Sequence, residues 1–119
     1  MDFEIKINSL YICVKDMERA ITFYENLFSQ QVDEKSDVFS VFDLQGFRFC
    51  LFNNNEVGEK VTYGDNCLPS FEVNNMDKLI SKLKELDAQL VFPLTKIKDN
   101  WVLEFRDSED NDIEVYCKI

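Results

Sequence analysis

The chain contains no histidine, an absence that restricts its chemistry more than any other feature of the composition. Histidine is the commonest protein ligand of transition metals and the most frequent general base near neutral pH. A metal or acid–base site in this chain must therefore use carboxylates, thiols or hydroxyls. The four cysteines form no CxxC motif, so we expect reduced thiols that pack as small apolar side chains rather than a zinc site.

Basic residues and long apolar runs are scarce as well. Lys and Arg number 13 against 23 Asp and Glu, which gives a net charge of −10. Because phosphate binding needs clustered positive charge, we expect no nucleic-acid partner. No apolar run is long enough to span a bilayer and no signal peptide opens the sequence, so we expect no membrane partner and a cytoplasmic protein.

An internal repeat organises the residues that are present. Residues 9–17 (SLYICVKDM) match residues 68–76 (LPSFEVNNM) at an offset of 68 − 9 = 59. Each segment predicts a short strand that runs directly into an amphipathic helix, with Asp16 or Asn75 as the N-terminal cap. Later strands match at an offset of 114 − 50 = 64.

Hydrophobic periodicity predicts two helices, one ending near residue 28 and the other covering about 76–86. The predicted strands cover residues 5–14, 30–35, 37–44, 47–53, 67–73, 89–93, 101–106 and 112–118. We therefore predict one α+β domain, residues 1–119, built from two βαβββ modules at about 1–53 and 67–119 with a polar linker at 54–66.

Two motifs accompany the repeat. Residues 14–24 (VKDMERAITFY) fit the pattern V-x-D-hydrophobic-x-x-A/S-x-x-F-Y, and residues 106–114 (RDSEDNDIE) are close to R-D-P-x-G-N-x-I-E. With these motifs the chain resembles the vicinal oxygen chelate superfamily of glyoxalases, bleomycin-resistance proteins and extradiol dioxygenases. The resemblance implies a curved mixed sheet with the helices on its outer face, and it implies a homodimer because relatives commonly dimerise.

The same resemblance makes the missing histidines informative. Metal-dependent relatives take four ligands from the first and last strand of each module, and the matching positions here are Ser9, Cys50, Leu68 and Glu114. Only Glu114 keeps a usual ligand type, whereas a catalytic divalent ion normally needs about three protein ligands. We therefore predict no metal site of the family type and no cofactor.

The family's ligand positions mark the concave face of the sheet, and side chains alternate between the two faces of a strand. The other face is wholly apolar, as packing under helices requires. Candidate ligand-binding residues on the concave face are Tyr11, Phe42, Arg48, Cys50, Phe52, Ser70, Glu72, Glu104, Arg106 and Tyr116. Aromatic walls with a few polar groups are typical of a small-molecule pocket, and the excess of acids favours a cationic or aromatic ligand.

Three functions remain open. The leading prediction is a metal-independent small-molecule binder that resembles bleomycin-resistance and other antibiotic-sequestering proteins, and not an enzyme. The second is a divergent glyoxalase-like lyase, isomerase or thiol transferase in which Glu114 is the catalytic acid or base. The third is a structural dimer whose cavity is filled by its own side chains, with Arg48 or Arg106 paired to Glu114 or Glu104.

Overall fold

The computed structural model describes residues 3–4, 6–64 and 67–119 and contains two mixed sheets and two α-helices. The first sheet has the order β1 (Ser9–Cys13), β3 (Phe47–Phe52), β2 (Phe39–Leu44). The second has the order β4 (Ser70–Glu72), β7 (Asp112–Lys118), β6 (Asn100–Arg106), β5 (Leu90–Ile97). Helix α1 (Met17–Phe28) follows β1, and α2 (Met76–Glu85) follows β4. We call the part from β1 to β3 module 1 and the part from β4 to β7 module 2.

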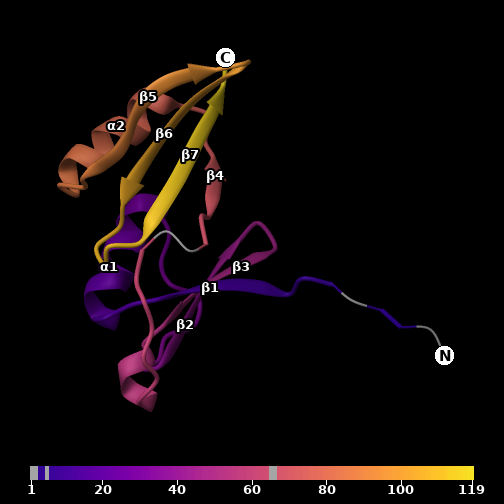
Figure 1. The fold of residues 1–119 in the computed structure, drawn as a ribbon, viewed down its shortest axis with the longest axis vertical. Helices are drawn as coiled ribbons and strands as arrows, with labels where there is room; N and C mark the ends of the chain where they lie inside the picture. Colours follow the sequence, from indigo (N-terminus) through magenta and orange to yellow (C-terminus); the bar gives the residue numbers. More distant parts are fainter. Residues whose placement is uncertain (1–2, 5, 65–66) are drawn as a thin grey trace.

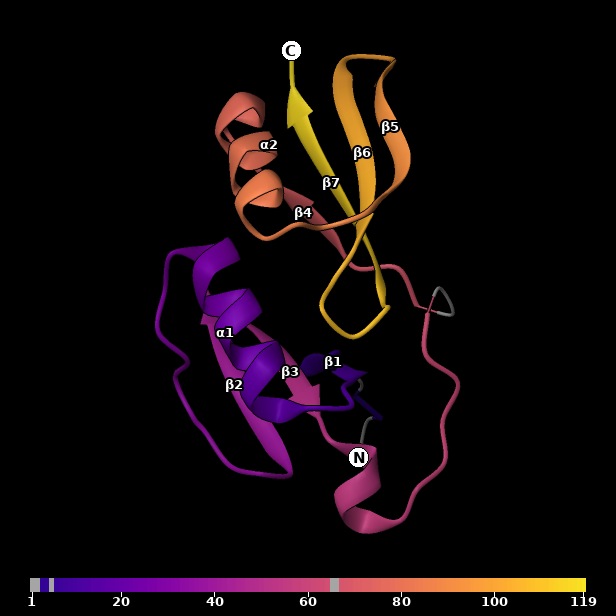
Figure 2. The ribbon, with the colours of Figure 1, turned by 90° about the vertical axis from the view of Figure 1, so that its left-hand side faces the viewer.

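Equivalent residues begin the two helices. The side chain of Asp16 accepts a hydrogen bond from the backbone N–H of Arg19 (3.1 Å), and that of Asn75 accepts one from Lys78 (3.0 Å). Each cap satisfies a backbone donor that the first helical turn leaves free. Both helices lie on the same side of the sheets (Figures 1 and 2), so each module packs one sheet face against its helix.

The two helix-covered faces share one core, because aromatic side chains bridge the modules. Phe71 of β4 packs against Phe28 of α1 and Phe49 of β3, with ring centroids 5.5 and 5.4 Å apart. Phe23 of α1 reaches Phe105 of β6 at 6.4 Å. The modules therefore pack against each other within one chain, through their helix sides.

The strand register reproduces both offsets of the repeat. Tyr11 lies opposite Cys50 in module 1, and Ser70 lies opposite Glu114 in module 2. Tyr11 and Ser70 are 59 residues apart in the sequence, and Cys50 and Glu114 are 64 apart, as the sequence matching predicted. The α+β architecture of two related modules is confirmed.

One predicted strand is absent from module 1. Of residues 30–35, only Glu34 makes a bridge, to Val41. Backbone hydrogen bonds join Asp33 and Glu34 to Val41 alone. Side chains make the remaining contacts: Gln30 donates to the carbonyl of Asp43, and the carboxylate of Asp33 accepts from the Asp43 N–H at 2.7 Å. Module 1 is therefore βαββ, whereas module 2 is βαβββ.

The other elements appear at or inside their predicted limits, except that β5 extends to Ile97 and β6 begins one residue early, at Asn100. Residue 5 of the first predicted strand and residues 65–66 of the predicted linker lie outside the described residues. The described part of the linker contains one 3-10 turn, η1 (Asn54–Val57). No helix in the described segments has the length and apolarity that a membrane crossing requires.

Glu109, in the loop between β6 and β7, clamps module 2 onto module 1. Its side chain has no exposed surface and accepts hydrogen bonds from the backbone N–H groups of Lys15 (2.8 Å) and Asp16 (2.9 Å). The guanidinium of Arg19 donates two more, at 2.7 and 3.0 Å. Burial raises the pKa of Glu109, but these hydrogen bonds outweigh it and leave the pKa below its usual value. The carboxylate is therefore ionised where the β1–α1 junction presents its free donors.

Candidate functional site

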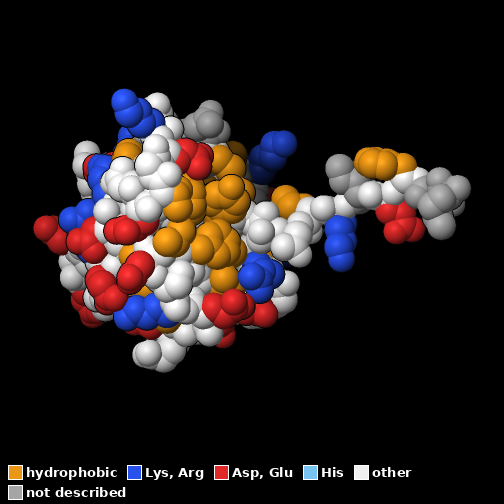
Figure 3. Space-filling model, turned by 90° about the horizontal axis from the view of Figure 1, so that it is seen from below, with side chains coloured by type: hydrophobic (Ala, Val, Ile, Leu, Met, Phe, Trp, Pro, Cys, Tyr) orange, Lys and Arg blue, Asp and Glu red, His pale blue; other side chains and the backbone are white. Residues whose placement is uncertain are grey.

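The sheet surfaces that face away from the helices form the candidate site, and we call them the open face of module 1 and the open face of module 2. The register defines three rows on the open face of module 1. They are Asp43–Arg48–Ser9, Val41–Cys50–Tyr11 and Phe39–Phe52–Cys13. In the view from below, apolar side chains gather beside the base of the N-terminal segment that leads into β1 (Figure 3).

The open face of module 1 is aromatic. Tyr11 is 53% exposed and stands edge-to-face with Phe39 (centroids 5.7 Å apart) and Phe52 (5.6 Å). Such clusters present flat apolar surfaces with polar edges, which suit organic ligands. Four of the predicted site residues, Tyr11, Arg48, Cys50 and Phe52, share this face in the register.

Cys50 lies at the centre of this face but is itself buried. Burial raises the pKa of its thiol, although the positive charge of Arg48 acts in the opposite direction. The Arg48 guanidinium pairs with the carboxylate of Glu34 at 3.3 Å, so it is not committed to Cys50. A protonated, buried thiol is a poor nucleophile.

The open face of module 2 is acidic. Its rows are Arg106–Asp112, Phe92–Glu104–Glu114–Ser70 and Thr95–Val102–Tyr116–Glu72. The hydroxyl of Ser70 donates a short hydrogen bond to Glu114, and the Tyr116 hydroxyl donates to Glu72 at 3.2 Å. Burial, the charge of Asp112 with a hydrogen bond to it, and the charge of Glu114 raise the pKa of Glu104. Predicted residues Ser70, Glu72, Glu104, Arg106, Glu114 and Tyr116 thus share one face.

Phe42 corrects the predicted site. Strand alternation predicts Phe42 on the concave face, and this prediction is wrong. Phe42 is fully buried against Tyr24 and Phe28 under helix α1. Its neighbours Phe39 and Val41 take the open face instead. Residues 38–42 are apolar at nearly every position, so alternation within this strand does not show which side chains face the helix. The pairing of Phe42 with the core residue Phe49 shows it.

Phe92 was missing from the predicted concave face, and Asp112, which alternation places on that face with Glu114, was not included in the predicted ligand-binding set. Phe92 continues the row of Glu104 and Glu114. Phe92 was overlooked because the strand predicted at residues 89–93 was too short to show how it would pair with the strand at residues 101–106. Asp112 lies two residues before Glu114 on β7, so alternation predicts both carboxylates on one face, where the register has them.

The residues at the four family ligand positions do not fit a catalytic metal centre. Leu68 is aliphatic, Ser9 is a weak donor unless ionised, and the pKa of Cys50 is raised by burial. Glu114 alone supplies a carboxylate, and it accepts a hydrogen bond from Ser70. Across residues 3–4, 6–64 and 67–119, no three or more His, Cys, Asp or Glu side chains are arranged to hold a metal ion. A hard carboxylate with one buried thiol is a poor donor set for a divalent catalyst.

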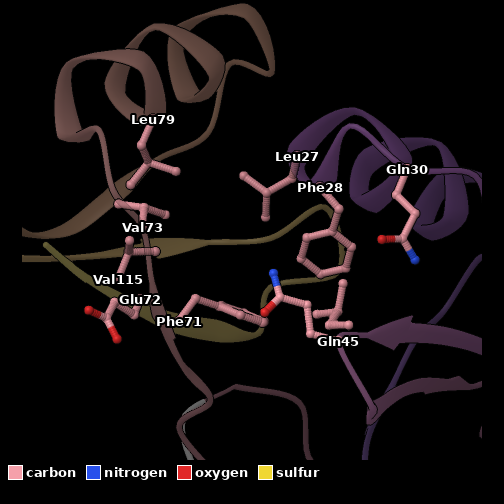
Figure 4. Close-up of a pocket in the computed structure, with 10 residues that line it drawn as sticks. Leu27, Phe28, Gln30, Gln45, Phe71, Glu72, Val73, Leu79 and Val115 are labelled. Carbon is pink, nitrogen blue, oxygen red and sulfur yellow. The ribbon is translucent and has the colours of Figure 1, made fainter.

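A separate groove of about 420 Å³ lies at the seam between the modules, on the helix side of the sheets. Figure 4 shows Leu27 and Phe28 of α1 on one side and Val73 and Val115 on the other, with Gln45 near Phe71. The groove contains Glu72 but none of the other predicted site residues.

Comparison with known proteins identifies the family. The Glyoxalase/Bleomycin resistance protein/Dioxygenase superfamily matches residues 6–115, so the chain belongs to this superfamily. A hypothetical protein from S. aureus aligns with a TM-score of 0.81 at 18% identity, covering 97% of this chain and 95% of that one.

Two functionally named structures are also similar. Lactoylglutathione lyase from Agrobacterium tumefaciens has a TM-score of 0.75 at 16% identity, over 94% of this chain and 92% of that chain. The fosfomycin resistance protein FosX from Mesorhizobium loti has a TM-score of 0.75 at 14% identity, over 98% and 95%. At such identities the likeness shows a shared fold and not a shared reaction.

Proposed function

We propose that this member of the superfamily binds a small organic molecule on its open faces without a catalytic metal. The observation that carries the proposal is the composition of these faces: an aromatic cluster around Tyr11 on module 1 and a row of carboxylates on module 2. Aromatic surface with a few polar groups favours ligand binding. The donor set at the family's metal positions does not support metal catalysis.

We also propose that two copies of the chain form the complete binding site. Neither helix covers an open face, and in the described residues β1 and β4 are edge strands that pair on one side only. Exposed edges and apolar sheet faces favour association. A dimer that brings the open face of module 1 of one copy toward the open face of module 2 of the other would enclose an aromatic and acidic cavity.

The ligand class that these faces favour is cationic or aromatic. Aromatic rings attract cations through their π faces, and carboxylates attract them by charge. Sequestration of such a compound, as in bleomycin resistance, requires only stoichiometric capture and no reactive group.

The experiment compares two exposed aromatic residues. Small neutral and cationic aromatic compounds are titrated into the protein while backbone amide NMR shifts and the melting temperature are followed. We expect shifts on β1, β3 and β7 and a rise in melting temperature, since a ligand that binds only the native state stabilises it. Tyr11→Ala should weaken binding at least tenfold, and Phe3→Ala, an exposed aromatic away from the faces, should leave it unchanged. Shifts confined to the seam groove would refute the proposal.

A second arm tests metal independence. The melting temperature is measured with Mn²⁺ or Ni²⁺ for the natural chain and for Glu114→Gln, and we expect no metal-dependent rise. A rise that disappears in Glu114→Gln would favour the lyase or transferase alternative, for which the structure offers one feature: the Glu114 carboxylate, held by Ser70 on the open face. Sedimentation of the same samples tests the dimer.

A further inference from the structure

Three carboxylates on the open face of module 2 lie together without a cation. Glu104 of β6 is directly opposite Glu114 of β7, and Asp112 is two residues before Glu114 on the same face. Like charges that face each other across a ladder destabilise a sheet. Within the described residues none of the three takes part in an ion pair.

The cation expected beside Asp112 is directed elsewhere. Arg106 lies directly opposite Asp112 across β6 and β7, but its guanidinium donates to the backbone carbonyl of Asp110 at 3.0 Å. Asp112 is only 5% exposed, and its Oδ1 accepts no hydrogen bond from any described residue. A buried carboxylate oxygen without a donor is rare in folded proteins and marks a place where a donor is missing.

The Asp112 side chain is directed toward its acidic neighbours. It lies within hydrogen-bonding reach of the Glu104 carboxylate, which is itself directly opposite Glu114. The cluster therefore has no ion-pair partner among the described residues, and Asp112 Oδ1 has no donor there. A bound cation that carries N–H groups would supply both.

The spacing of the carboxylates separates two kinds of cation. A metal ion needs its ligands converged at about 2.0–2.6 Å, and the described residues contain no such group of three. An ammonium group has three N–H donors, binds oxygen at about 2.7–2.9 Å and accepts looser geometry. Phe92 on the same row and Tyr116 on the next row offer apolar surface to the rest of such a ligand.

We propose that Glu104, Asp112 and Glu114 bind the primary ammonium group of an amine ligand. This inference rests on the proposed function, since it assigns the ligand's charged end to one part of the open faces. It makes Glu104 and Asp112 specificity-determining residues, neither of which lies at one of the four family ligand positions.

The test uses three probes that share a benzyl body: benzylammonium, benzyl alcohol and benzyltrimethylammonium. Affinities are measured by calorimetry at pH 7.5 for the natural chain, Glu104→Gln, Glu114→Gln and a control, Glu85→Gln, which removes an exposed carboxylate of α2 on the helix side. We expect benzylammonium to bind at least tenfold more tightly than either other probe. Glu104→Gln and Glu114→Gln should each weaken it at least tenfold, and Glu85→Gln should not. Circular dichroism verifies that each variant folds.

Several results would overturn the ammonium site. Equal binding of benzyl alcohol would show that the body alone is recognised, so the proposed function would stand while this inference fell. Equal binding of benzyltrimethylammonium would show that charge suffices without N–H donors. Unchanged binding in Glu104→Gln, or no binding of benzylammonium to the natural chain, would likewise refute it, and the Tyr11→Ala experiment would then decide the proposed function separately.

Discussion

Where the open face of module 1 carries Val41 and Cys50, the open face of module 2 carries Glu104 and Glu114 at the same places in the register. The helix-covered faces show no such contrast, because Phe49 in one module corresponds to Ile113 in the other and both are buried. A shared core therefore keeps one side of the repeat apolar in both modules. The open side, free of that requirement, has become aromatic in one module and acidic in the other.

The modules also differ in how their last two strands are joined. A tight turn at Gln45 and Gly46, both with positive φ, connects β2 to β3. The longer connection from β6 to β7 carries Glu109 into the β1–α1 junction of module 1. The two modules therefore differ at the connection between their last two strands, and in module 2 this connection makes the contact with module 1 through Glu109.

The largest effect should come from a pair of phenylalanines on opposite faces of β2. Phe42→Ala empties a fully buried site, and we expect it to lower the free energy of unfolding by about 3–5 kcal/mol. Phe39→Ala, on the half-exposed open face, should cost less than half as much. Urea denaturation measures both, and equal losses would contradict the assignment of the two faces.

The next effect tests the asymmetric clamp. Glu109→Ala removes a buried carboxylate and leaves Arg19 and two backbone N–H groups without their acceptor, so we expect a loss of about 3 kcal/mol, at the lower end for broken buried ion pairs. The control, Asp110→Asn, breaks the exposed pair with Lys15 and should change stability by less than about 1 kcal/mol. Similar losses in both variants would show that burial of Glu109 contributes nothing.

A smaller effect concerns a position where the helices differ. Tyr24 of α1 corresponds to Leu83 of α2, and only Tyr24 donates to a buried carboxylate, that of Asp107, at 2.6 Å. Tyr24→Phe leaves the Asp107 oxygen with fewer donors, so we expect a loss of about 1–2 kcal/mol. Tyr63→Phe removes a half-buried hydroxyl bound to Asn54 and should cost less in the same thermal unfolding series.

The smallest effect is a gain in stability on the acidic open face. Burial and the nearby acids raise the pKa of Glu104 in the folded protein. Proton binding to Glu104 therefore contributes fully to the free energy of unfolding below the unfolded-state pKa of about 4.3. This contribution is lost as the pH rises through the pKa of the folded state. Glu104→Gln should match the natural chain near pH 4 and be slightly more stable at pH 7. Urea unfolding at both pH values checks this, and a less stable variant at pH 7 would contradict it.

Much of the fold was predictable because it depends on local patterns. Offsets of 59 and 64, the caps Asp16 and Asn75, and the apolar helix-facing residues all follow from periodicity and capping chemistry. The prediction of a strand at residues 30–35 was wrong because backbone pairing there is limited to Asp33 and Glu34 with Val41, while side-chain hydrogen bonds from Gln30 and to Asp33 make the contacts with Asp43. No sequence pattern distinguishes those two outcomes.

The candidate site was predictable to a lesser extent. Alternation placed Tyr11, Glu104 and Glu114 on the open faces because polar and apolar residues alternate around them. It misplaced Phe42 because its strand is apolar on both faces. Glu109 carried no signal as a clamp, since its partners Lys15 and Asp16 are 94 and 93 residues away in the chain.

That separation bears on how the protein is synthesised. Module 1 leaves the ribosome before module 2, and the acceptor for the amides at the start of α1 is translated 93 to 94 residues after them. Until residue 109 emerges, these amides depend on water, and Phe28 and Phe49 lack their contact with Phe71. The first half alone therefore lacks contacts that stabilise it in the whole chain, and both modules gain them only when the second half is present.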